Sequence, residues 1–455
     1  MNKSINFLNL SLLLVGIVAS VLNKESIYVA LFLINIIFYM LSNIDDITFL
    51  LYSFLIPSKA LQFLAVLIVI LILLIKKNKV SYYKRTNIII IFLIYILIQS
   101  LFDVLIHEGS FLALILEFSI YSIYFVCIYL IINKASLINY KLIKNLEIIV
   151  VVEAIIGITQ FIISKQFGDS IRGSFISAHY YGIFLALWIF YYTKYLINDT
   201  QKANKIHVIF NYMLVIIMFV MNDAKHVYAI FIVALIIYYF IKKVSKKNVV
   251  VISGVFILLI IILGVNVFKI NSVQNKLNKE IPDVSQYVYN PRYNQKYIFF
   301  DRTFNTLEGY KFFIGEGLGQ YSSQASNYIA YNGFYHEDIG ERDKYFKSFI
   351  SKDYRYNIQD LMIGSYMRNI HNTSFVLSFP LQSFISIFAE IGFIGFIFML
   401  LVFKSYIKDY EDSIIIIFFI IISIFDIYFE VPSVFMMMNL FILLPYKYNI
   451  RNERQ

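Results

Sequence analysis

Charged residues are scarce in this sequence: of 455 residues, 15% are Asp, Glu, Lys or Arg, whereas 60% are hydrophobic. Soluble domains contain about 25% charged and about 45–50% apolar residues, so the composition excludes an ordinary soluble domain. Apolar runs recur along the chain, and a run of about 20 residues can cross a hydrocarbon core of about 30 Å as a helix. The composition therefore predicts a polytopic membrane protein.

Cysteine is almost absent as well. Cys127 is the only one, so neither a disulfide within the chain nor a cysteine-based metal site can form. The sequence shows no zinc-ligand spacing, no phosphate-binding loop and no nucleophile–base–acid pattern; GEGLGQ, at 315–320, lacks the third glycine of a dinucleotide-binding motif and is predicted to be a flexible turn. We therefore expect no metal ion and no cofactor.

The apolar runs predict an all-α fold, a polytopic helical membrane protein with 12 to 14 transmembrane helices and one large, partly helical external loop. The loop, 269–371, separates N-terminal transmembrane helices in 1–268 from C-terminal ones in 372–455. Segment 46–57 is short and ends at Pro57, which is typical of a re-entrant segment or an extension of its neighbour. The expected spans are 5–22, 27–43, 46–57, 60–75, 87–106, 111–132, 147–164, 173–193, 206–222, 226–241, 249–268, 384–403, 412–428 and 433–446.

The distribution of basic residues predicts the orientation of the chain. Lysine and arginine concentrate in one set of short connections, around 76–85, 134–144, 194–205, 242–247 and 404–408, and in the C-terminal tail. The opposite short connections carry only Lys24, Lys165, Arg172 and Lys225. By the positive-inside rule the richer set is cytoplasmic, as are both termini, with 5–22 as an uncleaved first helix. Orientation thus accounts for most of the +10 charge, and nucleic-acid binding is not expected.

Segment 269–371 is the one large polar region and is predicted to lie outside the membrane. It holds 13 of the 37 tyrosines, a composition that favours an ordered segment. The apolar and aromatic positions within 297–307 are typical of an amphipathic helix on the membrane or over a cavity. The tyrosines have two interpretations: they bind sugars, or they form an aromatic belt at the membrane interface.

Two outward-facing turns carry candidate residues. Arg172 and His179 are seven residues apart, which predicts that both lie on one face of the next span, and an ionisable residue within a span is a functional candidate by default. Lys225 and His226 begin the second turn, within NDAKH (222–226). The alternative for Arg172 and His179 is a pair with a structural role only. The alternative for Lys225 is a lysine at a helix end whose ammonium group reaches the membrane surface.

Further candidates lie in and after the large loop. Arg292 and Arg302 belong to its amphipathic part, where the alternative is simple exposure to water. His371 and Asn372 stand where the loop returns to the membrane, and the alternative there is the capped start of a helix. Glu390 follows inside the next span. Together these basic residues and histidines form a set that can hold a phosphate or diphosphate at the membrane surface.

The pattern resembles the bacterial polysaccharide polymerase and O-antigen ligase superfamily. The matching elements are IRGSFISAHYYGIFLAL before and within a span, the turn NDAKH two spans later, GEGLGQY in the long external loop, and HNTSFVLSFPLQSFISIFAEIGFIGFIF after it. Their order extends over nearly the whole chain. The sequence departs from the family at Lys225, where arginine is usual, and at AHY, which replaces a common Pro-Asn pair.

The resemblance implies an inverting, metal-independent glycosyltransferase in the bacterial cytoplasmic membrane. Its substrate would be an undecaprenyl-diphosphate-linked oligosaccharide repeat unit, polymerised into a capsule or O-antigen at the outer face, with membrane lipid, a flippase and chain-length regulators as partners. Cations must stabilise the departing diphosphate, and Arg172, Lys225 and one of Arg292 or Arg302 are the candidates. His371 would be the general base.

The resemblance also implies residues that contact the substrate: His179, His226, Asn372 and Glu390.

Three alternative functions stay open. A ligase uses the same donor and differs in the acceptor. A lipid-linked oligosaccharide flippase or other transporter would place substrate groups near the membrane midplane, with repeated halves and broken helices. A membrane scaffold would not explain so many ionisable groups near the outer face.

Overall fold

The computed structural model describes most of the predicted spans and part of segment 269–371. Within the described residues the chain is helical and contains no strand, which confirms the predicted all-α class. The predicted spans 5–22 and 249–268 lie outside these residues. The described ranges are 25–41, 46–56, 58–75, 87–107, 109–134, 140–165, 170–175, 177–198, 205–222, 224–243, 295–323, 325–326, 351–359, 361, 383–406, 413–425 and 428–443.

Apolar helices dominate the described chain. Four segments are long and apolar enough to cross a membrane, Asn87–Ile106, Phe111–Ile132, Glu147–Ser164 and Ser383–Ser405, and several shorter apolar helices accompany them. This supports a membrane protein, whereas the count of 12 to 14 spans stays a prediction. The helices outside the large loop are α2 (Glu25–Leu41), α3 (Asp46–Phe54), α4 (Lys59–Ile75), α5 (Asn87–Ile106), α6 (Phe111–Lys134), α7 (Tyr140–Ser164), α8 (Ala178–Asn198), α9 (Lys205–Asn222), α10 (Lys225–Lys243), α18 (Ser383–Tyr406), α19 (Ser413–Phe425) and α20 (Pro432–Leu443).

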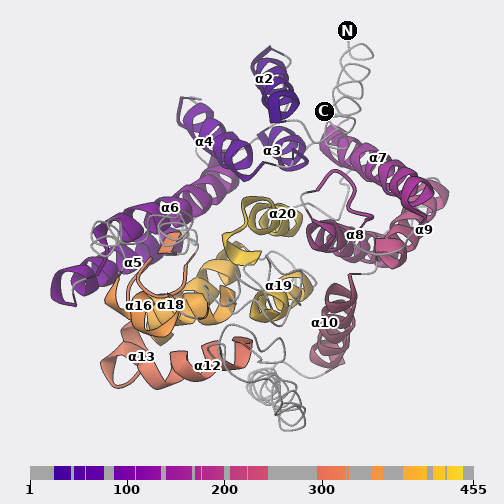
Figure 1. The fold of residues 1–455 in the computed structure, drawn as a ribbon. Helices are drawn as coiled ribbons and strands as arrows, with labels where there is room; N and C mark the ends of the chain where they lie inside the picture. The colour runs from indigo at the N-terminus through magenta and orange to yellow at the C-terminus, as the bar shows by residue number, and fades with distance from the viewer. Residues whose placement is uncertain are drawn as a thin grey trace.

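The helices form two groups joined by the C-terminal helices. In one group α5 packs against α6 and α18, and in the other α9 packs against α7 and α8. Figure 1 shows α20 and α19 between the two groups, and α20 contacts α3, α4 and α8. Large apolar side chains such as Ile98 and Leu105 are exposed on the outer helix surface, as contact with lipid allows.

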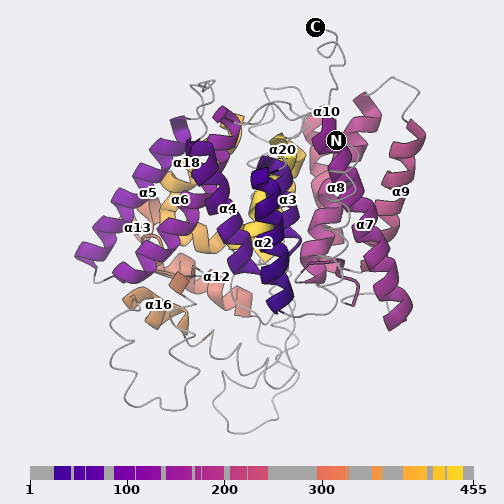
Figure 2. The ribbon, with the colours of Figure 1, turned by 90° about the horizontal axis from the view of Figure 1, so that it is seen from above.

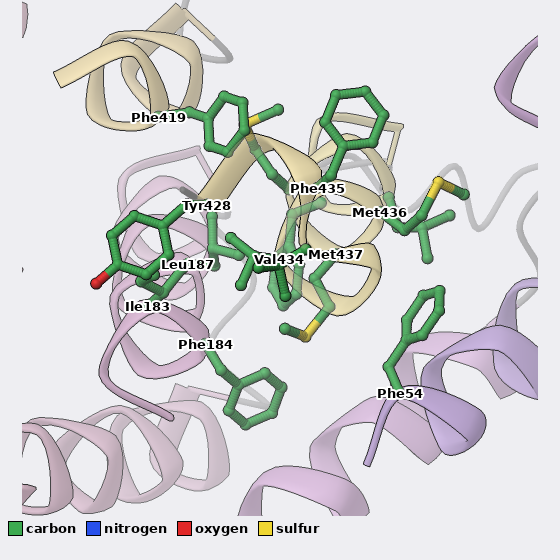
Figure 3. Packing of buried hydrophobic residues seen from close by; sticks show 14 of the residues in the cluster. Phe54, Ile183, Phe184, Leu187, Phe419, Tyr428, Val434, Phe435, Met436 and Met437 are labelled. Carbon is green, nitrogen blue, oxygen red and sulfur yellow. The ribbon is translucent and has the colours of Figure 1, made fainter. Parts of the chain in front are cut away.

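The centre of the packing is the short helix α20. Its residues Phe435, Met436 and Met437 are almost fully buried, and Figure 3 shows them among side chains from other helices, including Leu187 of α8 and Phe419 of α19. Within a bilayer, lipid tails are as apolar as these side chains, so helix association depends on close packing rather than on removing apolar surface from water. This cluster therefore holds the two helix groups together through van der Waals contact.

Helix α3 does not cross the membrane by itself. It has nine residues, and a helix of that length extends only about 14 Å. Its free carbonyl groups are satisfied by Gln62 of α4, whose Nε2 donates to Phe54 O at 3.1 Å and to Ile56 O at 2.9 Å. A buried helix end needs such partners. The interpretation of 46–57 as less than a full span is therefore consistent with the structure.

Helix α18 is interrupted at Gly392, where the backbone has φ of 66° and ψ of −177°. The interruption packs against Gly315, which also has a positive φ, of 84°. A Cβ atom on Gly392 would lie 2.4 Å from the Gly315 nitrogen, and one on Gly315 would lie 2.5 Å from the Glu390 carbonyl oxygen. Only glycine permits both the conformation and this close backbone approach.

The segment that reaches this interruption is GEGLGQYSS, 315–323. It is buried between α5, α6 and α18, and its backbone nitrogens donate to groups of those helices. Glu316 N donates to Ala389 O at 2.8 Å, Gly317 N to Glu390 O at 2.9 Å, and Leu318 N to Ser100 Oγ at 2.8 Å. The prediction of a flexible turn at 315–320 was therefore wrong, since the segment is part of the packed interior.

The Glu390 carboxylate is the acceptor that holds this segment. Its Oε2 accepts from Gly319 N at 2.9 Å, and its Oε1 accepts from the backbone nitrogens of Tyr321, Ser322 and Ser323 at 3.2, 3.0 and 2.9 Å. Glu117 of α6 adds a bond from Ala325 N at 3.2 Å. These bonds give five buried backbone N–H groups an acceptor, so the two acidic side chains hold 319–323 and Ala325 inside the helix bundle.

The described helices of the large loop lie at one end of the bundle. They are α12 (Gln295–Thr306), α13 (Tyr310–Ile314) and α16 (Lys352–Asn357), and Figure 2 shows α12 and α16 below α5, α6 and α18 in that view. The predicted amphipathic helix is present as α12, with Phe299 and Leu307 buried and Phe304 exposed. Ser351 caps α16 by accepting from Tyr354 N, and its hydroxyl donates to Gln320 O.

A group of charged residues joins α13 to α16. Lys311 Nζ lies 2.5 Å from Glu316 Oε2 and 3.8 Å from Asp353 Oδ2. Burial, together with the charge of Asp353, raises the pKa of Glu316 to about 7, although the Lys311 bond opposes the shift. Burial lowers the pKa of Lys311, but the bond and charge of Glu316 raise it more, so its net shift is upward. The pair is thus sensitive to pH near neutrality.

We predict that Glu390→Ala destabilises the fold. The substitution removes the acceptor of four buried N–H groups, and each such group left without a partner costs about 1–3 kcal/mol. Because these costs are not fully additive, we expect the free energy of unfolding to fall by about 3 kcal/mol or more. Thermal unfolding of the purified protein measures it, with Glu308→Ala as the control because Glu308 is exposed. Equal unfolding temperatures for the two variants would contradict the structural role of Glu390.

A second prediction concerns pH. The folded-state pKa of Glu316 is about 7, above its ordinary value of 4.5, so between these values the folded chain keeps a proton that the unfolded chain has lost. Stability must then fall as pH rises through this window. Glu316→Gln, which mimics the protonated form, should become progressively more stable relative to wild type as pH rises, whereas Glu308→Gln should not. Parallel pH dependence of wild type and Glu316→Gln would refute the assignment.

Candidate functional site

The connection between α7 and α8 folds back into the bundle and carries Arg172. Gln160 of α7 holds it: its Oε1 accepts from Arg172 N at 3.0 Å and from Gly173 N at 2.9 Å, and its Nε2 donates to Gly173 O at 2.8 Å. Gly173 has φ of 58°, a left-handed conformation that favours glycine. We call residues 170–177 the Arg172 turn.

A buried acidic side chain of α7 also bonds the Arg172 turn. Glu153 of α7, fully buried, accepts from Ser174 N at 2.9 Å and from the Ser174 hydroxyl at 2.5 Å. Tyr181 OH donates to the Glu153 carbonyl oxygen at 3.1 Å. A Cβ atom on Gly173 would lie 2.3 Å from Glu153 Oε2, so the turn has no space for a larger residue. These contacts make the Arg172 turn a rigid element.

The placement of Arg172 corrects one prediction. Helix α8 begins at Ala178, later than the predicted span 173–193, so Arg172 lies in the turn and His179 lies in the first turn of the helix. The two side chains therefore do not share a helical face, because the residues between them are not helical. They stand instead at the two ends of the Arg172 turn.

His179 and His226, from α8 and α10, are in contact. Their ring centroids are 4.2 Å apart in an edge arrangement, and His226 Nε2 lies 3.0 Å from Tyr428 OH. The Nδ1 atom of His179 is buried and has no hydrogen-bond partner among the residues that the structure describes. The structure thus brings together two of the predicted substrate-binding histidines, and leaves one ring nitrogen available to a ligand or a water molecule.

Tyr428 belongs to a 3-10 helix, η5 (Tyr428–Glu430), that links this site to the other helix group. Phe429 N donates to Ser383 Oγ at the start of α18, at 3.1 Å, and Glu430 O accepts from Tyr124 OH of α6 at 3.5 Å. The histidine pair is therefore connected through η5 to the helices that hold the large loop.

Arg172 has a guanidinium group that is available for an anion. The side chain is half-buried, and within the described part of the chain the only bonds of Arg172 are made by its backbone. A guanidinium fork binds phosphate oxygens in a bidentate manner. Lys225 is the first residue of α10, next to His226; its side chain lies outside the described residues. Two of the cations predicted to act together thus lie on the Arg172 turn and at the start of α10.

The candidates in and after the large loop are placed differently. Arg302 of α12 donates from Nη1 to Asn357 O of α16 at 3.1 Å, which gives it a part in joining these helices. Both carboxylate oxygens of Glu390 accept backbone N–H groups, so this residue supports the fold and does not offer a free carboxylate. Arg292, His371 and Asn372 lie outside the described residues.

Sequence reasoning missed the residues that build the Arg172 turn. Glu153, Gln160 and Asn222 are polar residues within apolar helices, and Glu153 and Asn222 are fully buried. An ionisable or amide side chain within a span is costly without a partner. The presence of these polar residues in apolar runs was therefore the sequence signal that could have identified them. Tyr428 gave no such signal, because a tyrosine is ordinary in a sequence with 37 of them.

Among the described residues, no group of three or more His, Cys, Asp or Glu side chains could hold a metal ion. No protein-family model matches the sequence, and comparison with curated proteins finds no match. The functional assignment therefore depends on the geometry of the site together with the resemblance of its motifs.

Proposed function

We propose that this protein is a membrane glycosyltransferase that polymerises undecaprenyl-diphosphate-linked oligosaccharide repeat units. One observation carries the proposal: segments that contribute to the resemblance, far apart in sequence, pack in pairs. The turn with Arg172 is hydrogen-bonded to Asn222, the first residue of NDAKH, and GEGLGQY encloses Glu390 of AEIGFIG. Motifs that contact one another are typical of a shared function rather than of coincidence.

The chemistry follows from the charges of the site. An acceptor sugar hydroxyl attacks the anomeric carbon of the growing chain, the bond from that carbon to the phosphate oxygen breaks, and undecaprenyl diphosphate leaves with the electron pair. Arg172, Lys225 and one of Arg292 or Arg302 stabilise the charge that develops on the leaving oxygen. Attack from the face opposite the leaving group inverts the anomeric centre. In the prediction from sequence, His371 takes the hydroxyl proton.

The proposed location is the outer face of a bacterial cytoplasmic membrane, with both termini in the cytoplasm. Both the Arg172 turn and the turn before α10 carry few basic residues, which is the basis of that orientation. The lipid donor would enter between helices, and the tyrosines of the large loop would bind glycan. The proposed partners are a flippase that supplies the donor and a chain-length regulator.

Two alternatives differ in what the site would bind. A ligase would use the same cations and the same donor but another acceptor. A flippase is favoured by one observation, the interruption of α18 at Gly392, because transporters often bind substrate at broken helices. That interruption is occupied by the chain's own segment 315–323, however, and its carboxylate is used by four backbone N–H groups, so polymerisation is the better-supported reaction.

The orientation gives a test by cysteine labelling. In a variant with Cys127 replaced by serine, a single cysteine at position 243 should resist an impermeant reagent added outside the cell, whereas one at position 275 should react. The charge distribution of the connections is the reason. Labelling at 243 but not at 275 would reverse the orientation and place the Arg172 turn on the cytoplasmic side.

The reaction is tested by Arg172→Ala. Loss of one transition-state donor reduces turnover by about 10²-fold or more, so polymer formation from purified lipid-linked repeat units should fall by that factor. Lys165→Gln removes a charge from an exposed side chain in the same connection and serves as the control. Polymer formation by Arg172→Ala at the wild-type rate would remove Arg172 from the site, and no polymer from the wild-type protein would contradict the proposed function.

A further inference from the structure

Asn222, the last residue of α9, joins the Arg172 turn to the turn before α10. Its side-chain Nδ2 donates to Ile171 O at 2.7 Å and to Ala178 O at 2.9 Å. These two carbonyl groups belong to the residues that immediately precede Arg172 and His179. One amide group therefore holds both ends of the Arg172 turn.

The position of Asn222 in the chain adds a second connection. It is followed within four residues by Lys225 and His226 at the start of α10. Because α10 begins three residues after Asn222, the bonds from Asn222 to Ile171 and Ala178 keep the start of α10 close to the Arg172 turn. The cations and histidines from two separate turns are thus placed relative to one another through this residue.

The surroundings of Asn222 leave it little freedom. Its side chain is fully buried, and a Cβ atom on Gly182 would lie 2.9 Å from Asn222 Oδ1 and 3.2 Å from Ala224 Cβ. A primary amide has two N–H donors, and both bonds that Asn222 makes use them. No other common side chain of this size supplies two donors, so the contact is specific to asparagine.

We infer that Asn222 is a positioning residue for the anion site formed by Arg172 and the start of α10. The inference rests on the proposed function, because the anion is taken to be the diphosphate of the lipid donor and product. Asn222 does not touch the ligand; it fixes the backbone from which Arg172 and His179 project. Its loss should weaken anion binding in the way that removal of an outer hydrogen-bond partner weakens a bound ion.

The test measures binding of undecaprenyl diphosphate to the purified wild-type protein and to three single variants. Asn222→Ala should lower the affinity by about 10- to 100-fold. Asn211→Ala is the matched control: Asn211 is equally buried on the same helix, three turns away from the site, so its loss should affect stability but not affinity. Gly182→Ala, which crowds the Asn222 amide, should lower the affinity less than Asn222→Ala and remains informative if that variant fails to fold.

The decisive comparison is a double-mutant cycle with Arg172→Ala. If Asn222 acts in part through Arg172, the double variant should lose less affinity than the sum of the two single losses, because coupled residues are not additive. Fully additive losses, or equal affinity for the Asn222→Ala and Asn211→Ala variants, would overturn the inference. Wild-type protein that binds the lipid diphosphate but makes no polymer would refute the proposed function alone, whereas no binding by the wild type would refute both.

Discussion

The arrangement of this protein depends on one carboxylate, that of Glu390, which accepts four backbone N–H groups inside the helix bundle. An irregular segment such as 315–323 can enter a membrane bundle only if its backbone groups find partners within the protein. The carboxylate supplies those partners from α18, next to the interruption at Gly392. Because the same segment continues into α13 on one side and toward α16 on the other, it anchors the described part of the large loop to α5, α6 and α18.

The same solution occurs at the other breaks in helical structure. Gln62 donates hydrogen bonds to backbone carbonyl groups at the end of α3. Gln160 and Glu153 accept from backbone N–H groups of the Arg172 turn, and Asn222 donates to carbonyl groups at both ends of that turn. In each case a polar side chain from a regular helix bonds the backbone of a neighbouring irregular segment. Polar residues in these helices are therefore explained by the backbone that they support. The resulting turns are rigid, which is the condition for holding cations at a fixed place.

The sequence predicted the parts of the fold that depend on local periodicity. The boundaries expected for α5, 87–106, agree with the structure, because a long apolar run defines both ends, and α12 was recognised from its amphipathic pattern. The burial of 315–323 could not be predicted in this way, since its partner Glu390 is 71 residues away from Gly319. The contact between His179 and His226 joins two of the candidate residues chosen from the sequence, but the position of Arg172 depends on a non-helical turn that periodicity does not reveal.

The central claim, that 315–323 is an interior element bonded to Glu390 rather than an exposed loop, is tested most directly by hydrogen exchange. Backbone amides that are buried and hydrogen-bonded exchange only when the structure opens. Peptides covering 316–323 in the purified protein should exchange as slowly as those of α5 and α18. Complete exchange of 316–323 within seconds, while α5 and α18 stay protected, would contradict the account.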